Sequence, residues 1–252
     1  MALQEEFEEQ GKWLFKYRGI LPIFIFVIGT FLYLRTEFYP ETFFLEETPY
    51  EIYFETLCLL ISLFGLAIRV FTVGYTPANT SGRNTAEGQV ADELNTSGIY
   101  STVRHPLYLG NFFMWLGPVL FLRSVWFTVV FALVFWLYYE RIMFAEEQFL
   151  RRKFGDAYDK WSAKVSAFIP FSFRFICPRI PFSFRSVLKR EYHSIINIFI
   201  IFAVLDLCRN YFLTERIFFT PIWWKVLTGA AVFWLITRII HKYTKWLEVG
   251  GR

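Results

Sequence analysis

The sequence contains few residues of the kinds that cross-link a fold or bind metal ions. Only three of its 252 residues are cysteines (Cys58, Cys177 and Cys208). They have no metal-ligand spacing, and their odd number argues against a disulfide framework. We therefore expect the three cysteines to be packing residues, and we expect no metal site. Charged residues make up 19% of the chain and the net charge is only +4, so we expect no nucleic-acid partner.

The N-terminal stretch MALQEEFEEQGKW also lacks the features of a secretory signal. It contains four Glu residues and no apolar core, whereas a cleavable signal peptide has a basic start followed by an apolar run. We expect this stretch to form a short amphipathic or frayed helix at the surface.

Apolar residues are abundant instead. Hydrophobic residues make up 55% of the chain and aromatic residues 22%, including 32 Phe, which is typical of an integral membrane protein. A helix needs about 20 apolar residues to cross the bilayer. Four runs come near this length: Gly19 to Leu34, Ile52 to Val73, Ile195 to Leu213, and Ile217 to Ile240.

Two shorter apolar runs, Tyr108 to Leu122 and Val125 to Tyr139, are separated only by Arg123 and Ser124. This spacing predicts a tight helical hairpin. The predicted fold is therefore an all-α, multi-pass membrane bundle of about six spans. Asp206 and Arg209 stand three residues apart within one span, and we expect them to form an ion pair within the helix.

The distribution of basic residues predicts the orientation. Eleven Lys or Arg lie between Arg141 and Tyr192, whereas Arg35 to Glu51 contains one Arg and five Glu. By the positive-inside rule the first segment is cytosolic, and six spans then place both termini in the cytosol. The sequence does not distinguish a bacterial inner membrane from the endoplasmic reticulum.

The stretch SGIYSTVRHPLYLG marks the point where a polar loop meets the hairpin. Pro106 suits the first position of a helix, so we expect the helix to start there. The backbone N–H groups of Leu107 to Leu109 then form a seat for an anion, with Arg104 and His105 beside it. Gly110 and Gly117 allow close approach of another backbone or a ligand.

The hairpin brings this stretch close to Glu146 and Glu147, which follow the second helix. An anion seat facing a carboxylate suits a zwitterionic ligand. The alternative is purely structural, because Arg and His at a helix start are common membrane anchors and Glu147 with Arg151 is an ordinary surface pair.

Two ordered motifs, SGIYSTVRHPLYLG and RIMFAEEQFLRRKFGDAYDKW followed by FIP, resemble the isoprenylcysteine carboxyl methyltransferase and phospholipid methyltransferase superfamily. The resemblance covers Leu94 to Pro170, about 30% of the chain. It implies an integral membrane methyltransferase that binds S-adenosylmethionine at the cytosolic helix ends and takes a lipophilic or lipid-linked substrate from the bilayer.

The resemblance also implies site residues. The implied cofactor-binding residues are Asp92, Leu94, Asn95, Tyr100, His105, Pro106, Leu107, Tyr108 and Glu146, with Glu146 meeting the ammonium group. Asp92 stands where the family has a histidine. Arg141 is the implied substrate contact, although it precedes Glu146 by five residues rather than four, which rotates it by about 100° on a helix.

Methyl transfer from a sulfonium is an in-line displacement that depends mainly on positioning. A carboxylate or phosphate acceptor is already ionised, and Arg104 or Arg141 would orient it. An amine acceptor would need a base, for which no residue is clearly assigned. We thus expect Arg104, Arg141 and Glu146 to be catalytic, with no metal, and leave the acceptor open.

Two other functions remain alternatives. Membrane sterol and steroid reductases share a motif similar to SGIYSTVRHPLYLG but bind NADPH, and a membrane protein without catalytic activity could retain the fold.

The sequence predicts a division into three parts. They are an N-terminal segment with two spans (1–73), a catalytic core (74–170), and a basic, aromatic connector with two spans (171–252). The last two spans are candidates for packing or an oligomer interface.

Overall fold

The computed structural model describes residues 2–19, 23–24, 27–29, 31, 50–77, 80, 89–171 and 174–251. In these ranges the chain forms helices and, apart from two isolated bridges, no β-structure, so the predicted all-α fold is confirmed. The elements are α1 (Leu3–Lys16), α3 (Glu51–Gly74), the 3-10 turn η2 (Ile99–Ser101), α4 (Pro106–Phe121), α5 (Val125–Phe154), α6 (Asp156–Ser162), α7 (Phe184–Thr214) and α8 (Pro221–Tyr243).

The long helices fit an integral membrane protein. Four of them, α3, α5, α7 and α8, are long and apolar enough to cross a membrane, and α4 is a shorter apolar helix. The predicted number of about six spans is not confirmed, because most of the run from Gly19 to Leu34 lies outside the described residues. The division into three parts and the oligomer interface stay predictions.

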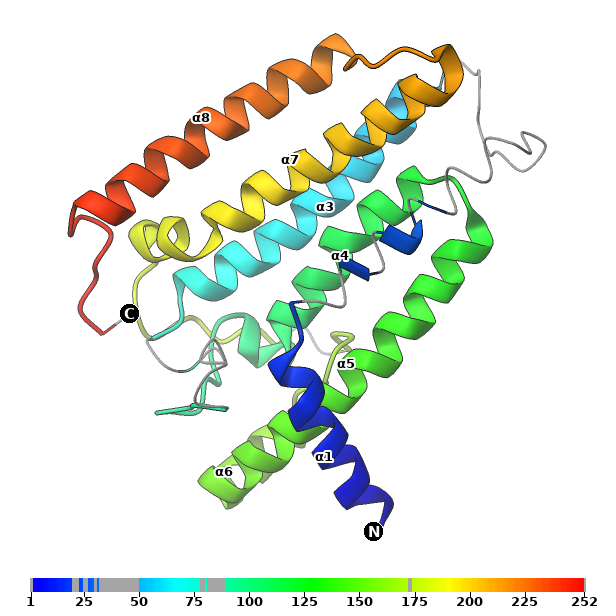
Figure 1. Ribbon diagram of the computed structural model, residues 1–252. Helices are drawn as coiled ribbons and strands as arrows, with labels where there is room; N and C mark the ends of the chain where they lie inside the picture. Colours follow the sequence, from blue (N-terminus) through cyan, green and yellow to red (C-terminus); the bar gives the residue numbers. More distant parts are fainter. Residues whose placement is uncertain are drawn as a thin grey trace.

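The four long helices and α4 lie side by side in the order α8, α7, α3, α4 and α5 (Figure 1). This order differs from the chain order, because α7 returns to pack against α3 on the side away from α5. As a result α3 and α4 form the middle of the layer. The short helix α1 crosses the far part of α5, near α6.

The predicted hairpin is present. Helix α4 begins at Pro106, as expected, and α5 begins at Val125 after Ser124, whose side chain accepts a hydrogen bond from the backbone N–H of Phe127 (3.4 Å). Unlike the short second arm that we predicted, α5 continues for 30 residues until Gly155, which adopts a φ of 51°. Glu146 and Glu147 therefore lie on the same continuous helix as the apolar span.

Close contact between α3 and α4 depends on glycine. A Cβ atom on Gly110 would lie 2.8 Å from the carbonyl oxygen of Gly65, and one on Gly117 would meet the backbone of Cys58 and the side chain of Ser62. The close approach predicted for Gly110 and Gly117 is therefore made by a helix backbone. It brings Arg69 of α3 directly beside α4.

Helix α1 packs against the part of α5 that carries the glutamates. Arg152 of α5 donates to both carboxylate oxygens of Glu8 (2.7 and 3.0 Å). The hydrogen bonds from Arg152 and Lys12 lower the pKa of Glu8 to about 2. The guanidinium of Arg141 lies 3.4 Å from the ring centroid of Phe7, so α1 covers one face of α5.

The predicted ion pair between Asp206 and Arg209 is wrong. Asp206 accepts hydrogen bonds from the backbone N–H and the hydroxyl of Thr220, at 2.8 and 2.6 Å, and so caps the start of α8. Arg209 donates to Glu55 of α3 at 2.8 Å. Contacts outside α7 satisfy both charges, because the start of α8 has backbone N–H groups that need acceptors and the buried carboxylate of Glu55 needs a cation.

Candidate functional site

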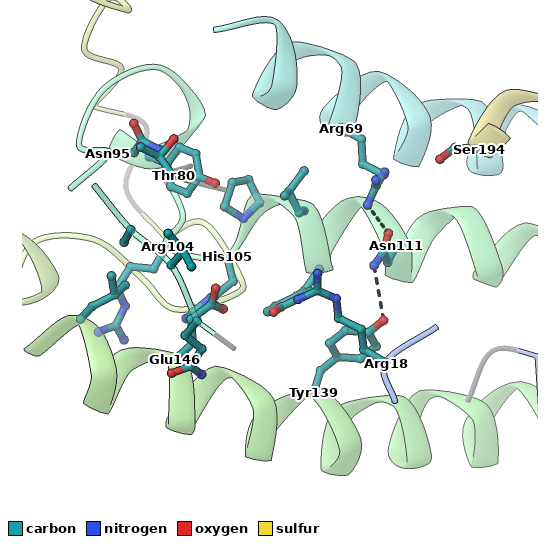
Figure 2. Close-up of a pocket in the computed structure, with 18 of the residues that line it drawn as sticks. Arg18, Arg69, Thr80, Asn95, Arg104, His105, Asn111, Tyr139, Glu146 and Ser194 are labelled. Atoms are coloured by element: carbon teal, nitrogen blue, oxygen red, sulfur yellow. Dashed lines mark hydrogen bonds and ion pairs between the residues drawn. The ribbon is translucent and has the colours of Figure 1, made fainter. Parts of the chain in front are cut away.

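A cavity of about 360 Å³ extends from the start of α4 into the helix layer, within the size range of small-molecule sites. Figure 2 shows polar residues at two places along it. We call the first the mouth, lined by Leu94, Asn95, Tyr100, Arg104, His105 and Glu146. We call the second the inner end, lined by Arg18, Arg69, Asn111 and Tyr139.

The backbone of the mouth is held by the chain that follows α6. The N–H groups of Arg104 and His105 donate to the carbonyl oxygens of Ser166 (2.8 Å) and Ala167 (3.1 Å), and Gly98 donates to Ile176 (2.8 Å). These bonds leave His105 with a non-helical conformation, φ −120° and ψ 61°, immediately before Pro106. The connection after the second motif therefore fixes the first motif in place.

Four charged side chains meet at the mouth. The two imidazole nitrogens of His105 reach different acids, with Nδ1 3.4 Å from Glu146 and Nε2 3.0 Å from Glu147. Glu147 also pairs with Arg104 at 3.3 Å. The side chain of His105 is 5% exposed, so the ring is clamped between the two carboxylates.

The charge of His105 follows from this arrangement. Burial disfavours the imidazolium, but hydrogen bonds to Glu146 and Glu147 outweigh that effect and raise the pKa of His105 from 6.5 to about 9. His105 is therefore protonated near neutral pH, and the two cations and two anions of the cluster balance.

The start of α4 is less open to an anion than the sequence predicted. The N–H groups of Tyr108 and Leu109 both donate to the carbonyl oxygen of His105, at 3.2 and 3.1 Å. The first turn is therefore largely satisfied by its own backbone. The expected anion seat is therefore wrong for the N–H groups of Tyr108 and Leu109, and side chains supply further donors for a ligand.

Among the described residues that line the cavity, three have a buried side-chain donor without a hydrogen-bond partner. These donors are Gln89 Nε2, Asn95 Nδ2 and Arg104 Nε. Unsatisfied buried donors are costly. Together with the carboxylate of Glu146 on α5, they suit a ligand that carries both acceptor oxygens or nitrogens and a cationic group.

The structure brings most of the predicted site residues to one place. Those that line the cavity are Leu94, Asn95, Tyr100, Arg104, His105, Pro106, Leu107, Tyr108 and Glu146. Two others do not line it. Asp92 is exposed in the loop before η2, and Arg141 faces α1, where it contacts Phe7 and pairs with Glu140 at 3.1 Å.

The inner end of the cavity was not predicted from the sequence. Arg69 stands inside the apolar run of α3 and Asn111 inside that of α4, and polar residues in such runs are frequently functional, so this signal was available. No comparable feature of the sequence indicated that residues of α7 line the cavity. Ser194, Asn197, Ile198 and Ile201 line the cavity only because α7 folds back beside α3.

Comparisons with known proteins agree with this geometry. Residues 57–157 match the family model described as phospholipid methyltransferase. The protein-S-isoprenylcysteine O-methyltransferase of Schizosaccharomyces pombe is 42% identical over 78 residues, which cover 31% of this chain and 33% of the relative. The rat enzyme of the same name is 30% identical over 138 residues, 54% of this chain and 48% of the relative.

A relative with a different name also matches, the nickel-cobalt-cadmium resistance protein NccN of Alcaligenes xylosoxydans, at 35% identity over 83 residues, 33% of this chain and 38% of the relative. The matches thus span about a third to a half of the relatives' lengths. No solved structure matches the chain. The matched region contains α4, α5 and the charged mouth, and it is similar to the phospholipid methyltransferase family and to isoprenylcysteine O-methyltransferases.

Proposed function

We propose that the protein is an integral membrane methyltransferase that uses S-adenosylmethionine and methylates a lipid or lipid-linked acceptor. The observation that carries this proposal is the cavity itself. Its mouth presents balanced charges and unpaired donors, and from there it continues between apolar helices. A polar cofactor and a lipophilic acceptor could therefore meet inside one cavity.

The residues at the mouth fit S-adenosylmethionine. Glu146 supplies a carboxylate for its ammonium group, whereas Arg104, Asn95 and Gln89 supply donors for its carboxylate and adenine. Bound there, the cofactor would supply a methyl group already activated by a sulfonium. His105 does not act as a base in this proposal, because it is protonated; it holds the carboxylates of Glu146 and Glu147 in fixed directions.

The inner part of the cavity fits a lipophilic acceptor. Its apolar lining comes from Met114 and Trp115 of α4 and from Ile198 and Ile201 of α7. Two of the three relatives named above are isoprenylcysteine O-methyltransferases, whose substrates carry a lipid. We infer that the acceptor group, a carboxylate, phosphate or amine, enters from the bilayer side, and that the mouth and both termini are cytosolic.

Among the predicted catalytic residues, Arg104 and Glu146 remain in the proposal. We leave out Arg141, because its guanidinium is held over Phe7 of α1 and does not line the cavity. An acceptor contact by Arg141 would require α1 to move away from α5.

Binding of S-adenosylmethionine and of NADPH to the detergent-purified protein tests the proposal. We expect micromolar affinity for S-adenosylmethionine alone, and at least tenfold weaker binding in His105→Ala, because the acids then lose their shared cation. His241→Ala, at the end of α8, is the matched control and should bind normally. Binding of NADPH alone would assign the protein to the reductases instead, and binding of neither would favour a silent fold.

A further inference from the structure

Four helices are joined by one polar network at the inner end of the cavity. Glu191 of α7 accepts hydrogen bonds from Nε and Nη2 of Arg69 on α3, at 3.0 and 2.9 Å. The remaining nitrogen of Arg69, Nη1, donates to Oδ1 of Asn111 on α4 at 2.6 Å. Asn111 Nδ2 then donates to the hydroxyl of Tyr139 on α5 at 3.3 Å (Figure 2).

The network fixes the direction of every bond. A guanidinium can only donate, so the side chain of Asn111 must turn its oxygen to Arg69 and its amide nitrogen to Tyr139. The oxygen of Tyr139 is therefore an acceptor in this bond. Its own hydrogen has no acceptor among the described residues, although the ring lines the cavity. This O–H is left to donate to an occupant of the cavity.

The neighbouring residue, Tyr138, has a hydroxyl group in different surroundings. It donates to the backbone carbonyl of Leu14 in α1 at 3.1 Å. Tyr138 does not line the cavity. The two neighbouring hydroxyls thus face different surroundings, and only that of Tyr139 is directed by an arginine.

The polar groups at the inner end favour an anion. The guanidinium of Arg69 is paired with Glu191, whose side chain is fully buried, and the hydroxyl hydrogen of Tyr139 needs an acceptor. The acids among the described lining residues are Glu93 and Glu146, both contributed by the segments that form the mouth. An ammonium group would therefore find no carboxylate among the described lining residues of the inner end, whereas an anionic oxygen can accept the hydrogen of Tyr139.

We propose that Tyr139 is a specificity-determining residue that donates its hydroxyl hydrogen to an anionic oxygen of the methyl acceptor, with Asn111 and Arg69 as the positioning residues. The identification of this ligand as the methyl acceptor rests on the proposed function. The binding of an anionic amphiphile does not, since it follows from the network alone.

Binding of three amphiphiles with the same alkyl chain, dodecanoate, dodecyl phosphate and dodecylamine, tests the proposal. They are titrated into the protein in nonionic micelles, with and without S-adenosylhomocysteine. We expect at least one anion to bind tenfold or more tightly than the amine. Tyr139→Phe should lower the affinity for that anion by about tenfold to a hundredfold, the range for a hydrogen bond to a charged group. Tyr138→Phe should leave this affinity unchanged.

The role of Asn111 is tested with Asn111→Asp. Aspartate can only accept, so the Tyr139 hydroxyl should turn toward it and stop donating to the ligand. Anion binding should weaken, and adding Tyr139→Phe to Asn111→Asp should cause little further loss, because the donor is already redirected. If the two losses multiply, the aspartate acts by charge repulsion alone and the positioning role is refuted.

The outcomes separate this inference from the proposed function. Equal binding of the amine and the anions, no binding of either anion, or an unchanged affinity in Tyr139→Phe would each overturn the inference. None of these results depends on methyl transfer. If the protein does not bind S-adenosylmethionine, the proposed function is overturned. The titration with the amphiphiles still tests the anion site separately. Comparison of dodecanoate with dodecyl phosphate then identifies the class of anion.

Discussion

At the residue scale, two adjacent acids of α5 have different surroundings. Glu146 lines the cavity and lies 3.4 Å from Nδ1 of His105. Glu147 does not line it and instead pairs with Arg104 and with Nε2 of His105. Consecutive positions on a helix differ in direction by about 100°. Glu146 can therefore face a ligand while Glu147 pairs with Arg104 and His105.

We predict that Glu146→Gln weakens binding of S-adenosylmethionine more than Glu147→Gln does. The first variant removes the carboxylate that faces the cofactor's ammonium, which should cost about tenfold or more in affinity. The second removes a partner of Arg104 and His105 and should act mainly on stability. Calorimetric titration of both variants, with thermal unfolding in parallel, measures the difference. Equal losses of affinity would refute the assignment of Glu146.

At the scale of elements, the contact between α3 and α4 positions the inner end of the cavity. Gly65 and Gly110 let the two backbones approach closely, and the stem of Arg69 passes beside Gly110. A larger residue at either position would push the helices apart. Because Arg69 bonds to Asn111 of α4 and to Glu191 of α7, such a shift would disturb three helices together.

We predict that Gly65→Ala destabilises the protein by about 1–3 kcal/mol, the usual cost of overpacking. Its new methyl group would lie within 3 Å of the backbone of Gly110 and Met114, which cannot move independently. Thermal unfolding in detergent measures the effect. Gly229→Ala on α8 is the matched control, since its Cβ would meet no atom within 4 Å. A Gly65→Ala protein as stable as this control would contradict the close packing.

At the scale of the whole molecule, the site and the basic segments share one end of the helix layer. The start of α4, α6 and the residues that follow α6 are all located there, whereas the connection between α7 and α8 is at the other end (Figure 1). If the basic end is cytosolic, the cofactor binds from the cytosol and the connection near Glu215 faces the opposite side.

We predict opposite labelling of two engineered cysteines by a membrane-impermeant maleimide. In a background with Cys177 and Cys208 replaced by serine, Glu215→Cys should react in intact cells, whereas Lys160→Cys on α6 should react only after permeabilisation. Both positions are exposed, so burial does not explain a difference. The reverse pattern would place the mouth outside the cytosol.

The amino-acid sequence alone was sufficient to predict several features. Apolar runs predicted helices at α3, α7 and α8, because a span needs a continuous length of nonpolar side chains. Pro106 predicted the start of α4, because proline lacks the N–H that a helix start leaves unpaired. The two motifs predicted that the RHP segment and the glutamates meet, because a hairpin returns the chain to the same side.

Only the tertiary structure decided the rest. The partners of Arg69, Asp206 and Arg209 lie on other helices, and no local spacing encodes such pairs, since a buried charge bonds to whichever polar group packing brings near it. The same packing turns Arg141 toward α1 and joins Tyr139, which lines the cavity, to Asn111 of α4. Local chemistry thus determined the helices and the mouth, whereas the order in which helices pack determined the inner end and what it can bind.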